Sequence, residues 1–249
     1  MAIKLVALDM DGTLLDGGQD ISPENRRWIR RAMEAGVTVC LASGRGRGSM
    51  LPYYERLGLS GQPFVAVNGG EVWRDANRLL SRRPLDRSLN GPLKAIAEAH
   101  DTWFWAYGLD GYLTKANWDA AFEKETWLKF GYYTEDPEAL ARVKEALAAL
   151  GPLEITNSDP NNLEVNPCGV SKAAGLAEVC RELGIRMEDA MAVGDSLNDL
   201  AMIRQAGIGV AMGNAQPAVK RAADAVVAGN EEDGVAEAIR RFVFGEAAR

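Results

Sequence analysis

The sequence has 249 residues, enough to bury a substantial core in one large domain or in a domain with an insert. Hydrophobic residues make up 47% and charged residues 25%, and the formal net charge is -7. This acidic balance, with no long basic run, argues against nucleic-acid binding. No apolar stretch approaches the roughly 20 residues that span a bilayer, and the N-terminus does not have the charged and apolar regions of a signal peptide. We therefore expect a cytoplasmic protein that binds neither nucleic acid nor membranes.

The cysteines and the histidine exclude several kinds of site. Cys40, Cys168 and Cys180 have neither the spacing of a metal site nor that of a disulfide framework. The single histidine, His100, excludes His-rich zinc sites and phosphohistidine pairs. Acid–base chemistry must therefore rely mostly on carboxylates or lysine.

Two carboxylates follow the first predicted strand. Residues 3–8 form an apolar run typical of a strand buried on both faces, and Asp9 and Asp11 come directly after it. Gly12 would let the chain turn so that Asp11 bends back toward Asp9. Neighbouring carboxylates repel each other, so their burial indicates a cation between them or a proton on one of them. Mg²⁺ would leave one carboxylate free to attack a phosphoryl group, whereas the alternative is an ordinary β-turn.

The next two predicted strands also end in small polar motifs. The elements expected here are a helix from Ser22 to Gly36, a strand over 37–41, a helix over 48–57 and a strand over 64–67. Three strands separated by helices imply right-handed crossovers and a parallel sheet. Ser43 and Asn68 each follow a strand, and either alone is explained by turn chemistry. Together with Asp9 and Asp11 they indicate a site along one edge of the sheet.

The pattern changes at about residue 84 to that of a small α+β module. Its expected elements are a helix over 85–99, strands over 102–107 and 112–115, a helix over 137–150, and strands over 153–157 and 163–165. Residues 116–135 show little strand pattern. Trp103, Trp105 and Tyr107 share one strand face, which favours the core of this module over a substrate-binding surface.

The α/β pattern returns after residue 167. The expected elements are a helix over 172–183, a strand over 190–193, a helix over 200–206, strands over 208–211 and 225–227, and a final helix. We therefore predict a core made of residues 1–83 and 167–249, with residues 84–166 inserted as a second unit.

Four motifs resemble those of the haloacid dehalogenase superfamily, in its Cof-type or class IIB phosphatases. They occur in the family's order: the segment 9–15, Ser43 within 42–45, Lys172 within 169–172, and the segment 194–199. The position of the insert matches the C2 cap class, so the resemblance implies a Rossmannoid parallel sheet with an α+β cap. Ser43 stands where threonine is frequent, which keeps the hydroxyl group, and Ala173 stands where glycine often follows the lysine.

The resemblance also implies roles for the acidic residues. Asp9 would attack phosphorus and form an aspartyl phosphate, and Asp11 would protonate the leaving alkoxide and later deprotonate the attacking water. Mg²⁺ would be held by the carboxylates of Asp9 and Asp195 and by the backbone carbonyl of Asp11. Asp199 would support this site by orienting Asp195 or a metal-bound water.

The phosphate oxygens would be held by a second group of residues. By resemblance these are Ser43, the Gly44 amide, Lys172 and Asn198. A cation at the start of a helix is unfavourable, and an anion beside Lys172 would rationalise its position.

These roles predict a Mg²⁺-dependent phosphomonoester hydrolase that acts on a small phosphorylated metabolite, such as a sugar phosphate or phosphoglycolate. A phosphomutase could share every core motif, since it also passes through an aspartyl phosphate. A phosphoacceptor signalling domain uses similar residues, but it needs only about half this length and has no use for a cap. Nothing in the sequence indicates an oligomeric state.

Overall fold

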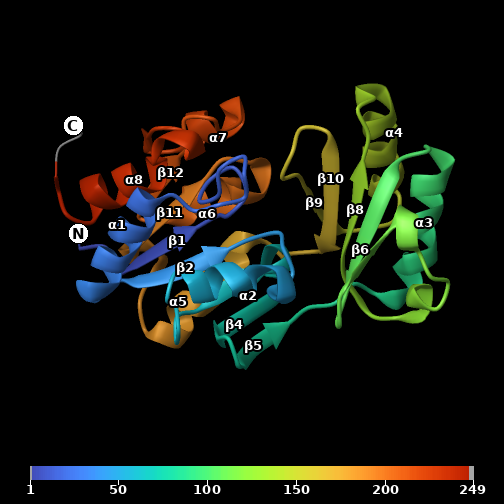
Figure 1. The fold of residues 1–249 in the computed structure, drawn as a ribbon. Helices are drawn as coiled ribbons and strands as arrows, with labels where there is room; N and C mark the ends of the chain where they lie inside the picture. The colour runs from blue at the N-terminus through green and yellow to red at the C-terminus, as the bar shows by residue number, and fades with distance from the viewer. Residues whose placement is uncertain (1, 247–249) are drawn as a thin grey trace.

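The computed structural model describes residues 2–246, which fold around two separate β-sheets (Figure 1). The larger sheet has eight strands in the order β13-β12-β11-β1-β2-β3-β4-β5, and the smaller has five in the order β7-β6-β8-β10-β9. The strands of the larger sheet are β1 (Leu5–Leu8), β2 (Thr38–Ala42), β3 (Phe64–Ala66), β4 (Glu71–Asp75), β5 (Arg78–Arg82), β11 (Ala190–Gly194), β12 (Ile208–Ala211) and β13 (Ala225–Val226). Those of the smaller sheet are β6 (Trp103–Gly108), β7 (Tyr112–Thr114), β8 (Trp127–Tyr133), β9 (Leu153–Thr156) and β10 (Asn162–Pro167).

Helices cover both faces of the larger sheet but only one face of the smaller. The larger sheet is covered by α1 (Pro23–Glu34), α2 (Arg47–Arg56), α5 (Lys172–Leu183), α6 (Leu200–Gln205), α7 (Pro217–Ala222) and α8 (Gly234–Phe242). Two helices, α3 (Asn90–Ala99) and α4 (Pro137–Ala148), lie on the side of the smaller sheet away from the larger one (Figure 1). The other face of the smaller sheet is thereby left to meet the larger unit.

Strand β1 lies in the middle of the larger sheet, in parallel pairing with β2 and β11. Leu5 and Ala7 pack on one face with α5 and α6, and Val6 and Leu8 pack on the other with α1, α2 and α8. Because both faces are covered, the strand is apolar throughout, which is why the sequence made it easy to find. The parallel core with an inserted α+β unit confirms the predicted fold class.

Side-chain caps fix the starts of three predicted helices. The Ser22 hydroxyl accepts from the amide of Asn25 at 3.0 Å, and the Ser171 hydroxyl accepts from the amide of Ala174 at 3.2 Å. The Asp136 carboxylate does the same at the start of α4. Each cap satisfies an amide that the helix leaves free, and the three helices begin where the sequence predicted.

The sequence reading missed the antiparallel hairpin formed by β4 and β5. This hairpin extends the larger sheet beyond β3, and its charged residues conceal the strand pattern. Glu71 is buried because its carboxylate binds the Arg82 guanidinium at 2.7 Å on the neighbouring strand. Such a pair makes a charged residue compatible with a buried strand.

The reading of 116–135 as a segment with little strand character was also wrong. It contains β8, which lies between β6 and β10 and pairs with both in antiparallel register. Six of its seven residues are buried, so the alternation of polar and apolar side chains that marks a half-exposed strand is missing. The smaller sheet therefore has five strands where the sequence predicted four.

The chain passes from the larger sheet to the smaller after β5 and returns after β10. We propose domain boundaries at 83/84 and 166/167, and we call residues 84–166 the cap and the remainder the core. Within residues 2–246, no helix is long and apolar enough to cross a membrane.

Candidate active site

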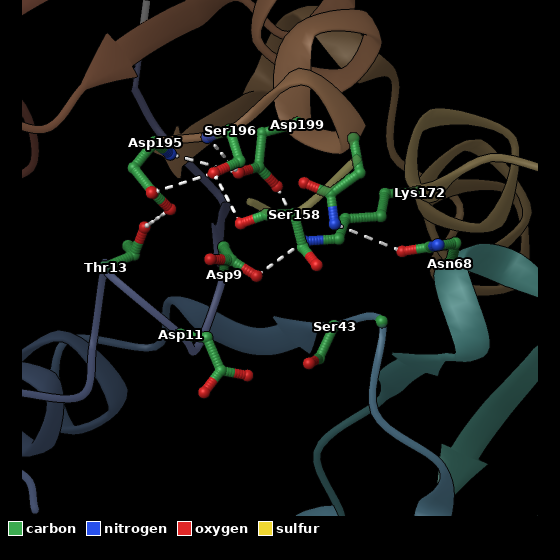
Figure 2. A network of polar contacts seen from close by, with 12 residues as sticks. Asp9, Asp11, Thr13, Ser43, Asn68, Ser158, Lys172, Asp195, Ser196 and Asp199 are labelled. Carbon is green, nitrogen blue, oxygen red and sulfur yellow. Dashed lines mark hydrogen bonds and ion pairs between the residues drawn. The ribbon is translucent and has the colours of Figure 1, made fainter. Parts of the chain in front are cut away.

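The candidate residues gather at the carboxyl ends of three neighbouring strands of the core (Figure 2). Asp9 follows β1, Ser43 follows β2, and Asp195 follows β11. Since these strands are adjacent and parallel, their ends meet at one edge of the sheet, as the sequence predicted.

Three carboxylates and one ammonium group form a buried cluster at this edge. One carboxylate oxygen from each of Asp9, Asp195 and Asp199 lies within 4.8 Å of the others. The Nζ atom of Lys172 lies 2.5 Å from Asp9 Oδ1 and 2.7 Å from Asp199 Oδ1, and its side chain is fully buried. With all three carboxylates ionised, the cluster would carry two more negative charges than the Lys172 ammonium balances.

Burial and mutual repulsion shift the pKa values of these groups. Burial, with the charge of Asp199 added to it, raises the pKa of Asp9 well above its ordinary value. The same two causes raise the pKa of Asp195 to about 6. Burial alone would lower the pKa of Lys172, but the charges of Asp199 and Asp9 outweigh it and raise that pKa. The excess negative charge is therefore the main electrostatic feature of the site.

Both carboxylate oxygens of Asp199 already accept hydrogen bonds from protein donors. One of its carboxylate oxygens accepts from Lys172, and the other accepts from the backbone amides of Asp195 and Ser196 at 3.0 and 3.1 Å. These contacts fix the loop that carries Asp195. The geometry suits the supporting role predicted for Asp199 better than direct binding of a cation.

The residues around Asp195 fit a small, hard cation. Its carboxylate is oriented by the hydroxyl groups of Thr13 and Ser196, which donate at 3.1 and 2.9 Å. The backbone at Gly12 lies so close to the Asp195 carboxylate that a side chain at this position would place its Cβ atom 2.7 Å from Asp195 Oδ2. Carboxylate and backbone carbonyl oxygens are the donors that Mg²⁺ prefers, and one divalent ion would balance the charge of the cluster.

Asp11 does not fold back toward Asp9 as the sequence reading expected. Its carboxylate accepts from Nε and Nη2 of Arg45 at 2.7 and 2.5 Å, and Figure 2 shows the side chain pointing away from Asp9. Burial alone would raise the pKa of Asp11, but the hydrogen bonds and charge of Arg45 outweigh it and lower that pKa. Asp11 is therefore held as an anion in this arrangement.

A cavity of about 210 Å³ brings most of the predicted phosphate-binding groups to Asp9. Ser43, Gly44 and Asn198 line it together with Asp9, whereas Lys172 is buried behind Asp9. The side chain of Asn198 donates from Nδ2 to Asn68 Oδ1 at 3.3 Å. Its Oδ1 atom is buried and has no hydrogen-bond partner in the described part of the chain.

The opposite wall of the cavity comes from the cap. It consists of Trp105, Tyr107, Lys129, Ser158 and Glu164. The interpretation of Trp103, Trp105 and Tyr107 as the core of the cap was therefore wrong. The intervening residues of β6, Phe104 and Ala106, are the ones buried under α3 and α4.

Lys129 and Glu164 were missed altogether by the sequence reading. They form a buried ion pair with an N–O distance of 2.7 Å on adjacent cap strands. Each also reaches the core: Lys129 Nζ donates to the Gly44 carbonyl at 2.7 Å, and Glu164 Oε2 accepts from Asn68 Nδ2 at 2.7 Å. Lys129 was missed because β8 itself was not recognised, whereas Glu164 lies in a predicted strand and nothing in the sequence indicated its distant partner.

Comparison with known protein families matches the chain to the haloacid dehalogenase-like hydrolases over residues 6–126 and 110–239. The chain therefore belongs to this family, as its motifs predicted. The 5-amino-6-(5-phospho-D-ribitylamino)uracil phosphatase YcsE of Bacillus subtilis (strain 168) is 45% identical over 242 residues, which cover 97% of this chain and 96% of that protein. The phosphoglycolate phosphatase of Methanobrevibacter smithii is 31% identical over 246 residues, covering 98% of this chain and 100% of that protein.

A solved structure supports the same assignment. The crystal structure of a haloacid dehalogenase-like hydrolase from Bacteroides thetaiotaomicron superimposes with a TM-score of 0.80 at 32% identity, covering 96% of this chain and 99% of that one. The protein is accordingly an enzyme, a phosphatase of the haloacid dehalogenase type.

Proposed function

We propose that the protein is a Mg²⁺-dependent phosphomonoester hydrolase that works through an aspartyl phosphate on Asp9. The observation that carries this proposal is the position of Asp9, buried at the end of β1 with Lys172 Nζ at 2.5 Å and with Ser43 and Gly44 in the same cavity. A carboxylate can attack a phosphate dianion only where positive charge and hydrogen-bond donors offset their repulsion.

The proposed reaction has two steps. In the first, a carboxylate oxygen of Asp9 forms a bond to phosphorus, the bond to the leaving oxygen breaks, and that oxygen takes a proton from Asp11. In the second, Asp11 takes a proton from a water whose oxygen attacks phosphorus, which restores the Asp9 carboxylate and releases inorganic phosphate. Asp11 is an anion while Arg45 holds it, so before the first step its side chain must rotate away from Arg45 and take up a proton from solvent.

The metal would be held by the carboxylates of Asp9 and Asp195 and by the backbone carbonyl of Asp11. When bound, Mg²⁺ supplies the positive charge that the acidic cluster needs to accept a phosphate. Ser43, the Gly44 amide, Lys172 and Asn198 would then bind the phosphate oxygens. For Asn198 this requires Nδ2 to leave Asn68, its present partner.

The substrate is proposed to be a small phosphorylated metabolite. The name of the relative with 45% identity makes 5-amino-6-(5-phospho-D-ribitylamino)uracil the first compound to test. Phosphoglycolate follows, because the phosphatase named for it is 31% identical over nearly the whole chain. Sugar phosphates complete the set that the sequence indicated.

The test measures phosphate release from p-nitrophenyl phosphate and from these metabolites, with Mg²⁺, with a chelator, and after Mg²⁺ is restored. We expect turnover that depends on Mg²⁺ and is abolished by Asp9→Asn. Asp101→Asn is the matched control, since it makes the same change in a cap side chain that is 96% exposed. Phosphate labelling without turnover would indicate a phosphoacceptor domain instead, and stimulation by a sugar bisphosphate would indicate a phosphomutase.

A further inference from the structure

Strand β6 of the cap turns an aromatic face toward the active site. Its residues alternate, so that Phe104 and Ala106 enter the core of the cap while Trp103, Trp105 and Tyr107 lie on the opposite face. Trp105 and Tyr107 line the cavity that contains Asp9, and Trp103, which is 43% exposed, is not among the residues that line it.

The indole of Trp105 lies flat against the neighbouring strand of the cap. Its register partner on β8 is Gly131. If Gly131 had a side chain, its Cβ atom would lie only 2.1 to 2.7 Å from three atoms of the Trp105 indole. Glycine at this position therefore allows one face of the indole to rest on the backbone of β8. None of the aromatic ring pairs found among residues 2–246 includes Trp105, so protein rings do not cover its outer side.

Tyr107 is held in place where the cap meets the core. A Cβ atom on Gly46 would lie 2.9 Å from the tyrosine ring, so the ring rests against the start of α2. Tyr112 stacks on it with ring centres 5.2 Å apart, and the ammonium of Lys129 lies 5.1 Å from its centre. Tyr107 also lines a second cavity of about 560 Å³, which offers room for a group that extends beyond the first.

The same cavity offers polar groups for a chain that links a phosphate to a ring. The buried Oδ1 of Asn198 lacks a hydrogen-bond partner among the described residues and can accept from a hydroxyl or amine group. Ser158 and Glu164 line the same cavity and offer further polar atoms. The cavity thus combines the proposed phosphate-binding groups, further polar atoms and an aromatic wall.

We propose that Trp105 is a specificity-determining residue that stacks on a planar ring in the leaving group of the substrate, with Tyr107 as a fixed part of the cavity wall beside it. This inference rests on the proposed phosphatase function of the same cavity. It assigns the substrate class as phosphomonoesters whose leaving group ends in a planar heterocycle, in preference to esters with only an aliphatic chain.

The test compares two substrates that differ only in the ring. They are 5-amino-6-(5-phospho-D-ribitylamino)uracil and D-ribitol 5-phosphate, and the readout is the ratio of their kcat/KM values. Wild-type enzyme should favour the compound with the ring, and Trp105→Leu should lower the ratio about 5- to 150-fold, the range for one ring stacked on one aromatic side chain. Trp105→Phe should keep most of the preference. Trp103→Leu is the matched control, a change on the same strand face but outside the cavity, and should leave the ratio unchanged.

A second readout does not depend on hydrolysis. Calorimetry should show the dephosphorylated compound, 5-amino-6-(D-ribitylamino)uracil, binding more weakly to Trp105→Leu than to wild type by a similar factor. An equal loss of kcat/KM for both substrates would show that Trp105 acts only on the structure and would overturn the inference. If neither substrate is hydrolysed but Trp105 still determines binding of the ring compound, the proposed phosphatase function fails and the ring site stands.

Discussion

The buried ion pair between cap strands gives a quantitative test of how the cap is held on the core. The side chains of Lys129 and Glu164 are 2% and 4% exposed, and each has a further partner in the core. The perturbation is Lys129→Met, which removes the ammonium group and keeps an unbranched side chain. The variant leaves the Glu164 carboxylate buried, with hydrogen bonds from Asn68 and Ser158 but without a counter-charge.

The magnitude follows from the geometry. At an effective dielectric constant of about 20, charges 2.7 Å apart attract with about 6 kcal/mol, most of which offsets the desolvation of both groups. Removal of one partner from a buried pair costs about 3–5 kcal/mol in the free energy of unfolding. We expect about 3 kcal/mol for Lys129→Met, because Asn68 and Ser158 still donate to Glu164. We expect a slightly larger loss of free energy of unfolding for Glu164→Gln, because this change leaves the buried Lys129 ammonium with only the Gly44 carbonyl as a strong partner.

The assay is a double-mutant cycle from urea unfolding followed by tryptophan fluorescence. Four of the six tryptophans lie within residues 84–166, so the signal reports mainly on the cap. The double variant Lys129→Met/Glu164→Gln leaves no unpaired charge. Its loss of free energy of unfolding should therefore be smaller, by about 2 kcal/mol, than the sum of the losses of the two single variants. Lys115→Met, which breaks the exposed pair with Asp101, should cost at most about 1 kcal/mol. Two results would refute the reasoning. One is that either single variant loses less free energy of unfolding than Lys115→Met, and the other is that the two single losses add up to the loss of the double variant within about 0.5 kcal/mol.

Three further predictions concern the proposed chemistry. Asp195→Ala should abolish activity by weakening Mg²⁺ binding, and a calorimetric titration with unchanged metal affinity would rule this out. Asp9→Asn should prevent formation of the phosphoenzyme, whereas Asp11→Asn should slow turnover about 10²–10⁴-fold and accumulate a phosphate-sized mass on the peptide of residues 5–15. Equal labelling in both variants would place the nucleophile elsewhere. Deletion of residues 85–165 with bridging of the ends should spare some p-nitrophenyl phosphate hydrolysis but remove discrimination among metabolites, and a folded capless protein that still discriminates would contradict the role of the cap.

The core was predictable because its signals are local. A parallel strand covered on both faces is apolar along its length, so polar residues stand out where it ends, as Asp9 and Asp195 do. Helix starts were equally readable, since the hydroxyl groups of Ser22 and Ser171 bind amides only three residues away. Adjacent parallel strands then bring those ends together without further information.

The missed strands depended on partners distant in sequence. Lys129 lies in the middle of β8, and its charge is acceptable there only because Glu164, 35 residues later, is buried beside it. Glu71 in β4 is acceptable because Arg82 pairs with it. A charged residue lowers the strand propensity of a segment, and the sequence alone does not reveal the counter-charge.

The prediction that the aromatic face of β6 forms the core of the cap failed for a different reason. Trp103, Trp105 and Tyr107 alternate with Phe104 and Ala106, so both faces of the strand are apolar and the two-residue period does not distinguish them. Only the position of α3 and α4 decides which face becomes the core of the cap. The larger side chains were left to face the active site, where their size suits the binding of a ligand.

Electrostatics explain why Asp11 lies away from Asp9, which the motif did not suggest. The acidic cluster already holds three carboxylates against the single ammonium of Lys172, so a fourth anion beside Asp9 would deepen the repulsion. Arg45 offers Asp11 a separate counter-charge, and its own backbone amide donates to the Ser43 hydroxyl at 3.1 Å. One residue thus contacts both the proposed acid–base group and a proposed phosphate-binding group. A phosphate dianion that reaches Ser43 adds negative charge near Arg45 and competes with Asp11 for its guanidinium. Competition of this kind gives a physical route by which substrate binding would release Asp11 toward the leaving oxygen.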